Sequence, residues 1–310
     1  AAGNDLLFDE SLCQQGKNFS NKIWNATRLI KGWEVGSNTK QTESAKQGID
    51  WFETKFQAAL LEIEDHFSKY RISDALMTTY KLVWDDFCSW FLEIIKPSYG
   101  SPIDENSYKK AVYFLEQNLK LLHPFMPFLT EEIWQLLDER SPETALIISE
   151  WPKKQPVNLE IIKDFEVTTS LISHIRSIRK EKNISFKQSL TLVGLGSKFP
   201  IPNLAVVQKL GNIDAVSFVN DKPNQSASFR IGALEFFIPL ETENIDEELK
   251  KIQEELAYAK GFLKSVQKKL SNERFMSGAP EKVVALEKQK EADALAKIAT
   301  LESSLQSLKN

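Results

Sequence analysis

The residue types that usually carry catalysis are few in this chain and lie far apart. His66, His123 and His174 fall in separate predicted elements, without cysteine or carboxylate partners at metal-ligand spacing. Carboxylates are spread over helix surfaces, and no glycine-rich loop with phosphate-binding spacing precedes a helix. Cys13 and Cys88 lack a metal-type spacing, which fits a reducing compartment rather than a disulfide framework. The sequence therefore predicts no catalytic residue and no metal site, but a binding and positioning module.

A polar face on the first long amphipathic segment is the first candidate binding surface. Apolar residues such as Phe19, Ile23 and Ile30 recur at helical spacing, which predicts a helix over about 11–33 with this stripe inside. The opposite face carries amide and cationic side chains: Lys17, Asn18, Asn21, Lys22, Asn25 and Arg28. These residues could equally be a solvated face or ties between helices.

Composition limits the functional classes. Apolar residues make up 42% and charged residues 26% of the 310 residues, as in ordinary globular proteins. The formal net charge of −4 gives no general case for nucleic-acid binding, so any basic surface must be local. No apolar run approaches the roughly 20 residues that span a bilayer, so we expect no membrane association. The chain opens on Ala1 without a signal peptide, and we expect it to be part of something longer.

The elements that position these residues begin with a helical bundle. Further apolar stripes predict a helix over about 49–70, a helix from a cap at Ser73 to about 94 with Tyr80 on its buried face, and a helix that leads into an elbow at residues 121–137, LLHPFMPFLTEEIWQLL. Pro124 and Pro127 prevent a straight continuation there, and Thr130 is expected to cap the next helix. Long helices with short links predict an antiparallel bundle over 11–140, after a lead-in at 1–10.

A different pattern follows the bundle. Prolines mark 141–158 as a linker, with a short strand expected at 146–148. A helix over about 159–182 and β-rich runs at 190–195, 215–219 and 229–239 predict a small α+β unit at 159–241.

The last segment, 242–310, has the pattern of a coiled coil. Apolar residues follow a 4-3 spacing from Ile245 to Leu270 and again from Val284 to Leu308, although Glu287 and Glu291 weaken the start of the second run. Two such helices joined by a turn predict an antiparallel hairpin, the first helix of which would reach roughly 42 Å at 1.5 Å per residue. Because the partner helix is in the same chain, we expect a monomer rather than a dimerisation zipper.

Four segments carry a family resemblance. The elbow resembles the end of the anticodon-binding bundle of class I aminoacyl-tRNA synthetases for large aliphatic amino acids. Residues 17–26, KNFSNKIWNA, resemble the valyl-type signature after the catalytic domain, although arginine is common where Lys17 stands. Residues 174–184, HIRSIRKEKNI, resemble a valyl-type stretch, and residues 272–284, NERFMSGAPEKVV, resemble the turn of the valyl C-terminal coiled coil. The chain thus resembles the C-terminal portion of a valine–tRNA ligase.

This resemblance implies a mainly α fold with an anticodon-binding bundle, a small α+β junction and a coiled-coil arm. It implies binding to valine-specific tRNA in the cytoplasm, the bundle at the anticodon and the arm along the outer corner. The nucleotide-binding signatures are absent, so ATP and magnesium are implied only for the full-length enzyme, and no cofactor for this part. Besides the polar face of the first helix, the implied tRNA contacts are Arg176, Arg179, Lys180 and Lys182 at the junction, and Lys260, Lys264, Lys268, Lys269 and Arg274 on the arm.

Two alternatives remain open at this point. The chain could be the corresponding part of an isoleucyl or leucyl enzyme, or a helical scaffold that binds proteins through its coiled coil. Salt-sensitive tRNA binding separates the scaffold from the synthetase hypothesis, and exchange of the anticodon separates the valyl enzyme from its relatives.

Overall fold

The computed structural model describes residues 8–197, 199–240, 242–271 and 281–309. The chain divides into two compact units, residues 1–173 with 199–213, and residues 174–198 with 214–310. The mainly α fold predicted from hydrophobic periodicity is confirmed.

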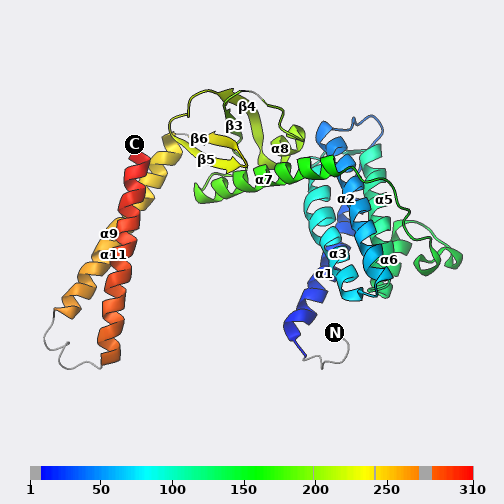
Figure 1. The fold of residues 1–310 in the computed structure, drawn as a ribbon, viewed down its shortest axis with the longest axis horizontal. Coiled ribbons are helices and arrows are strands. Elements are labelled where there is room, and N and C mark those ends of the chain that lie inside the picture. The colour runs from blue at the N-terminus through cyan, green and yellow to red at the C-terminus, as the bar shows by residue number, and fades with distance from the viewer. Residues whose placement is uncertain (1–7, 198, 241, 272–280, 310) are drawn as a thin grey trace. The chain divides into compact units, whose positions relative to one another are not determined.

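The first unit contains the predicted helical bundle, drawn in blue to green in Figure 1. Phe52 lies at the centre of its core, with its ring centroid 4.8 Å from that of Phe91 and 4.9 Å from that of Phe114. All three side chains are buried to within 1% of full burial, so an aromatic cluster holds helices from distant parts of the chain together. The helical elements are α1 (Glu10–Lys31), α2 (Glu43–Ser68), α3 (Ile72–Lys81), the π-helical segment η1 (Leu82–Phe91), α4 (Leu92–Ile95), α5 (Glu105–Leu122) and α6 (Pro127–Leu137).

Side-chain caps set the start of three of these helices. Asp9 accepts a hydrogen bond from the Ser11 amide before α1, Thr42 from the Ala45 amide before α2, and Asp104 from the Ser107 amide before α5. Each cap satisfies an amide that has no partner within its own helix. The two-residue strands β1 (Val35–Gly36) and β2 (Ile103–Asp104) pair in parallel and join the loops that lead into α2 and α5.

Two local expectations within the bundle are wrong. The helix after the elbow starts at Pro127, because proline fits the first turn without an amide donor. Thr130 lies inside that helix, and its hydroxyl lies 2.8 Å from His123 Nδ1 and 2.9 Å from the carbonyl oxygen of Met126. Ser73 likewise lies inside α3 and does not cap it.

The segment expected to be a short strand is a 3₁₀ turn, η3 (Leu146–Ile148). The Leu146 amide donates to the Glu131 carboxylate, 2.8 Å away, and the Ile148 amide donates to the carbonyl of Ala145. The turn thus satisfies its backbone groups locally rather than in a sheet ladder. A second 3₁₀ turn, η2 (Pro142–Thr144), precedes it.

A helix that the sequence did not predict, α8 (Leu204–Gly211), packs against α2 and α4 in the first unit. Lys209 fixes it in place, because its ammonium group donates to the carbonyl oxygens of Ile94, at 2.6 Å, and Lys96, at 2.7 Å. Those carbonyls lie at the C-terminal end of α4, where helix carbonyls lack intrahelical partners. Burial lowers the pKa of Lys209 to about 8.

The predicted β-rich runs form one four-stranded sheet in the order β4-β3-β6-β5, with β6 antiparallel to both β3 and β5. The strands are β3 (Leu190–Leu195), β4 (Ile213–Val219), β5 (Ser226–Ile231) and β6 (Leu234–Pro239), and the helix before them is α7 (Leu159–Glu181). The part of α7 from His174 onward belongs to the second unit, together with nearly all of this sheet. The ring of His174 stacks on that of the strand residue Phe229, with centroids 5.0 Å apart.

The arm consists of α9 (Thr242–Leu270) and α11 (Glu281–Lys309), which lie side by side and antiparallel (Figure 1). Ala259 and Val266 of α9 and Ala294 and Ile298 of α11 are buried along the seam, as the heptad pattern predicts. The turn between the helices lies outside the described residues. No helix in the described ranges is both long and apolar enough to cross a membrane.

Candidate nucleic-acid interface

The polar face of α1 is exposed, as the sequence predicts. Phe19, Ile23 and Ile30 are buried against the bundle. Five of the six candidate residues lie exposed on the opposite face of α1: Lys17, Asn18, Asn21, Asn25 and Arg28. Asn18 also accepts a hydrogen bond from the side chain of Gln14, 2.9 Å away. The face therefore combines amide groups, which can pair with base edges, and cations, which can pair with phosphates.

Lys22, the sixth candidate, is half-buried and bound within the protein. Its ammonium nitrogen lies 2.9 Å from the hydroxyl oxygen of Ser89 and 4.1 Å from the ring centroid of Trp84. The Ser89 hydroxyl in turn donates to the Trp84 carbonyl across 2.8 Å. Lys22 thus links α1 to η1, a role that the sequence could not reveal.

Aromatic rings lie directly beside this lysine. Tyr80 stacks on Trp84 with centroids 5.7 Å apart and an interplanar angle of 11°, and Phe19 lies 4.6 Å from Tyr80. Sequence analysis placed Tyr80 among the buried residues, whereas the structure leaves it half-exposed. An open groove of about 480 Å³ begins at Phe19 and Tyr80 and continues over Leu76, Met77 and other residues of α1, α3 and the elbow.

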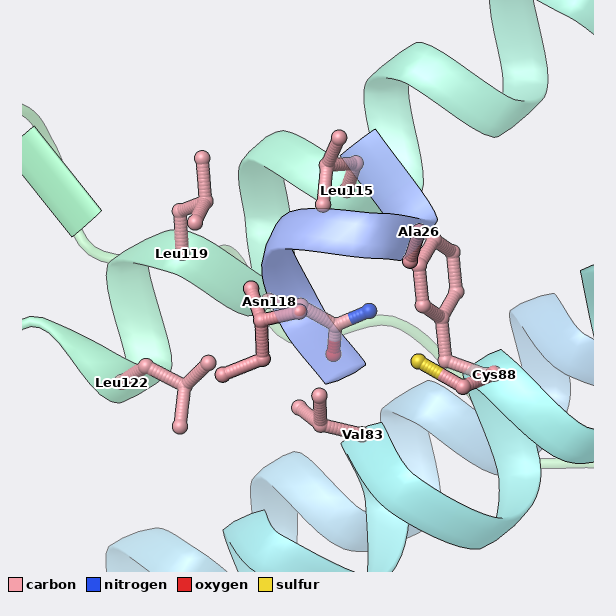
Figure 2. Close-up of a pocket in the computed structure, with 9 residues that line it drawn as sticks. Ala26, Val83, Cys88, Leu115, Asn118, Leu119 and Leu122 are labelled. Atoms are coloured by element: carbon pink, nitrogen blue, oxygen red, sulfur yellow. The ribbon is translucent and has the colours of Figure 1, made fainter. Parts of the chain in front are cut away.

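A second hollow in the bundle is part of the core and offers no room for a ligand or a water molecule. Figure 2 shows Asn118 among its mainly apolar lining residues, which come from α1, the π-helical segment and α5. Asn118 is 1% exposed, and neither its Nδ2 nor its Oδ1 atom has a hydrogen-bond partner among the described residues. Burial raises the pKa of the neighbouring Cys88 to about 12, which makes its thiol a poor nucleophile.

The four junction candidates differ in their surroundings. Arg176 and Lys180 are exposed and Lys182 is half-buried, whereas Arg179 is 4% exposed. The Arg179 guanidinium donates to the carbonyl oxygens of Ser185 and Gln188, both at 2.8 Å. Burial lowers its pKa. Arg179 therefore fixes the turn between α7 and β3.

On the arm, two of the predicted cations are paired with carboxylates of the other helix. Lys260 lies 2.6 Å from Glu302, and Lys269 lies 3.9 Å from Glu287. Lys264 and Lys268 are exposed. Arg274 lies outside the described residues. Glu287, which the heptad pattern identified as a weak point, is buried beside the seam, where a hydrogen bond from Lys290 lowers its pKa.

Across the described ranges, no group of three or more histidine, cysteine, aspartate or glutamate side chains could hold a metal ion. The structure brings together two features that sequence analysis did not connect, the polar face of α1 and the aromatic ladder of Phe19, Tyr80 and Trp84. It also exposes Tyr258 and Phe262 on the arm. A signal for these two was available, because large aromatic residues stand there outside the heptad seam.

Comparison of the sequence with known proteins identifies related families and relatives. Residues 50–193 match the anticodon-binding domain of tRNA ligases, and residues 244–309 match the valyl tRNA synthetase tRNA binding arm. The chain is 55% identical to a valine–tRNA ligase of Christiangramia forsetii and 48% identical to one of Phocaeicola vulgatus, over 99% of its length and 35% of theirs. It is 31% identical to a valine–tRNA ligase of Thermotoga maritima over 99% of the chain and 36% of the relative.

These matches favour the valyl type over both the isoleucyl or leucyl alternative and the protein-binding scaffold. The chain spans about a third of the length of the curated relatives it matches. With an anticodon-binding domain and a tRNA binding arm in the order that its sequence motifs predict, the chain belongs to the valine–tRNA ligase family.

Proposed function

We propose that this chain is the tRNA-recognition part of an enzyme that attaches valine to its tRNA in an ATP-dependent reaction. In this proposal the bundle binds the anticodon stem-loop, and the coiled-coil arm binds the outer corner of the tRNA. The observation that carries it is the presence of both matches, an anticodon-binding domain at 50–193 and a valyl-type arm at 244–309, on one chain.

The bundle offers a surface with suitable chemistry for an anticodon loop. Unpaired loop bases are recognised by hydrogen bonds to their edges and by stacking on aromatic rings. Asn18, Asn21 and Asn25 expose amides on α1, and the half-exposed rings of Tyr80 and Trp84 lie beside Lys22. We assign Lys17 and Arg28, at the two ends of the same face, to phosphate contacts.

The arm and the junction would contact the tRNA backbone. Exposed lysines attract phosphates irrespective of base sequence, so they position the RNA without specifying it. We assign this role to Lys264 and Lys268 on the arm and to Arg176, Lys180 and Lys182 after the bundle. Lys260, Lys269 and Arg179 lie near these surfaces, but they form contacts inside the protein.

ATP and magnesium belong, in our proposal, to the full-length enzyme and to residues outside this chain. The sequence contains no glycine-rich phosphate-binding loop, and the described residues contain no cluster of metal ligands. The described residues therefore do not form a site for ATP or for magnesium, and we assign no chemical step to this chain. We place the protein in the cytoplasm and expect a monomer, since α11 covers the seam of α9 within one chain.

Titration of the purified chain with valine tRNA, and with the same tRNA carrying a substituted anticodon, tests the proposal. We expect tighter binding of the natural anticodon and affinity that falls as salt rises. Deletion of 244–310 should weaken binding of both RNAs without changing the preference between them, because backbone contacts do not specify sequence. Equal affinity for the two RNAs would refute the anticodon assignment, and unchanged affinity after the deletion would refute the arm assignment.

A further inference from the structure

The turn between α7 and β3 presents a phenyl ring to solvent. Phe186 is 57% exposed, whereas Ile184, two residues earlier, is buried and anchors the same turn. The amide of Gln188 donates to the carbonyl of Ser185, 3.1 Å away, which closes a tight turn. Phe186 and Lys187 occupy its two central positions, where glycine, proline, asparagine, aspartate or serine is usual. The needs of the turn therefore do not explain a phenylalanine at this place.

Buried contacts hold the ring where it is. The Arg179 guanidinium, itself 4% exposed, donates to the carbonyls of Ser185 and Gln188, both at 2.8 Å. The amide of Ile184 donates to the Arg179 carbonyl across 2.8 Å, so the entry to the turn is tied to the same residue. The guanidinium carbon lies 5.5 Å from the centroid of the Phe186 ring, within the range of a cation–π contact. One part of the ring thus lies against the protein, and the turn holds the rest toward solvent.

The segment around the ring is strongly basic. Residues 176–188 contain one carboxylate, that of Glu181, and five cationic side chains: Arg176, Arg179, Lys180, Lys182 and Lys187. Their formal charge is +4, in a chain whose net charge is −4. Arg176, Lys180 and Lys187 are exposed. The turn is therefore a local basic surface on an acidic chain, and charge favours an anionic partner there.

An aromatic ring among cations matches the chemistry of a nucleotide. Aromatic side chains stack on the faces of unpaired bases, and lysine and arginine neutralise the adjoining phosphates. Proteins that bind single-stranded nucleic acid combine these two contacts, with little dependence on the identity of the base. The tRNA that we assign to this chain supplies both groups in one molecule.

We propose that Phe186 stacks on an unpaired nucleobase of the tRNA, and that Lys187, its neighbour in the turn, contacts an adjoining phosphate. This inference rests on the proposed function and deepens it, because it adds a base contact at the junction, where the cations alone would contact only the backbone. Arg179 is a positioning residue in this arrangement, since it supports the turn from inside the protein.

Three substitutions of Phe186 in the full chain test the inference. Phe186→Ala should weaken binding of valine tRNA about 5- to 150-fold, the range that stacking of one base confers. Phe186→Leu keeps an apolar side chain that cannot stack, so it should weaken binding to a similar extent. Phe186→Tyr keeps an aromatic ring and should bind like the parent.

The salt dependence separates the ring from the cation beside it. None of the three Phe186 variants should change the slope of log affinity against log salt, because stacking releases no counterions. Lys187→Ala should reduce that slope by about one unit. Ultraviolet crosslinking of the complex, followed by mass spectrometry, should join a nucleotide to the peptide that contains Phe186.

Leu159→Ala is the matched control, since Leu159 is 64% exposed at the other end of α7 and should not affect binding. Circular dichroism and thermal melting should be alike for all these variants. If Phe186→Leu binds as tightly as Phe186→Tyr, the contact is not stacking and the inference is wrong. If every Phe186 variant binds like the parent while deletion of 244–310 weakens binding, the inference is wrong and the proposed function stands. If the parent chain shows no salt-dependent binding of tRNA, the proposed function itself fails, and the inference with it.

Discussion

The ammonium nitrogen of Lys22 lies 4.1 Å from the ring centroid of Trp84, so a cation assigned to tRNA is also a structural contact between α1 and the π-helical segment. π-Helical turns in proteins occur often at functional sites. Here the segment places Trp84 next to the polar face of α1 and supplies the Ser89 hydroxyl as a second partner for Lys22. Lys22 therefore stabilises the bundle at a position that the sequence proposes for RNA contact.

Lys22→Ala should lower the free energy of unfolding by about 1–2 kcal/mol, because it removes a cation–π contact and a hydrogen bond that are only partly solvated. Urea titration of the purified chain measures this loss. The exposed neighbour Lys17 provides the comparison.

Lys17→Ala should leave stability within about 0.5 kcal/mol of the parent and reduce the slope of log affinity against log salt by about one unit. If Lys22→Ala proved as harmless to stability as Lys17→Ala, the contact with Trp84 would contribute nothing measurable. If Lys17→Ala left the salt slope unchanged, Lys17 would not contact a phosphate.

The helices of the bundle and the arm were predictable because their apolar residues recur at one period over many turns. Ile23 and Ile30, or Val266 and Ile298, identify a buried face without reference to the rest of the chain. Lys22 shows the limit of that reasoning. Its helical position predicts a polar face, but its partners Trp84 and Ser89 stand more than 60 residues later and are brought to it only by packing.

Arg179→Ala should cost about 1–3 kcal/mol of stability, because it removes two charge-assisted hydrogen bonds to the carbonyls of Ser185 and Gln188. The neighbouring Lys180→Ala, at an exposed position, should change stability by less than about 0.5 kcal/mol. Thermal or urea unfolding followed by circular dichroism distinguishes the two. An equal, small effect of both substitutions would show that the turn does not depend on Arg179.

Local structure was less predictable where backbone conformation departs from common patterns. Helix α8 has only eight residues and is flanked by Asn203 and Asn212, both with positive φ of 49° and 51°. Such a short helix gives a weak periodic signal, and its main anchor, Lys209, binds carbonyls more than 100 residues away. Thr130 does not cap α6 because the helix already begins at Pro127, where a proline fits the first turn.

Asp86 should make the stability of the bundle depend on pH. Burial raises the pKa of its carboxyl to about 6, although Lys55, 3.7 Å away, acts in the opposite direction. The folded state therefore binds a proton that the unfolded state, with a carboxyl pKa near 4, releases. This contribution to stability is complete below about pH 4 and is lost as pH rises to about 6.

Asp86→Asn removes the cost of the buried charge, so it should stabilise the chain more at pH 7.5 than at pH 5, with a difference of about 1 kcal/mol. Urea denaturation at the two pH values measures it. Asp50→Asn, at an exposed position of α2, removes the same charge and serves as the control. A gain from Asp86→Asn that is the same at both pH values would contradict the raised pKa.

The last prediction concerns Asn118, whose buried amide has no hydrogen-bond partner among the described residues. Burying an amide without partners costs about 1–3 kcal/mol, and alanine is the better helix former. Asn118→Ala should therefore stabilise the chain by about 1 kcal/mol, despite the smaller side chain. Leu119→Ala, at the next residue of α5 and equally buried, should cost about 2–5 kcal/mol. Urea unfolding of both variants decides the matter: a loss from Asn118→Ala as large as that from Leu119→Ala would mean that the amide is hydrogen-bonded in solution.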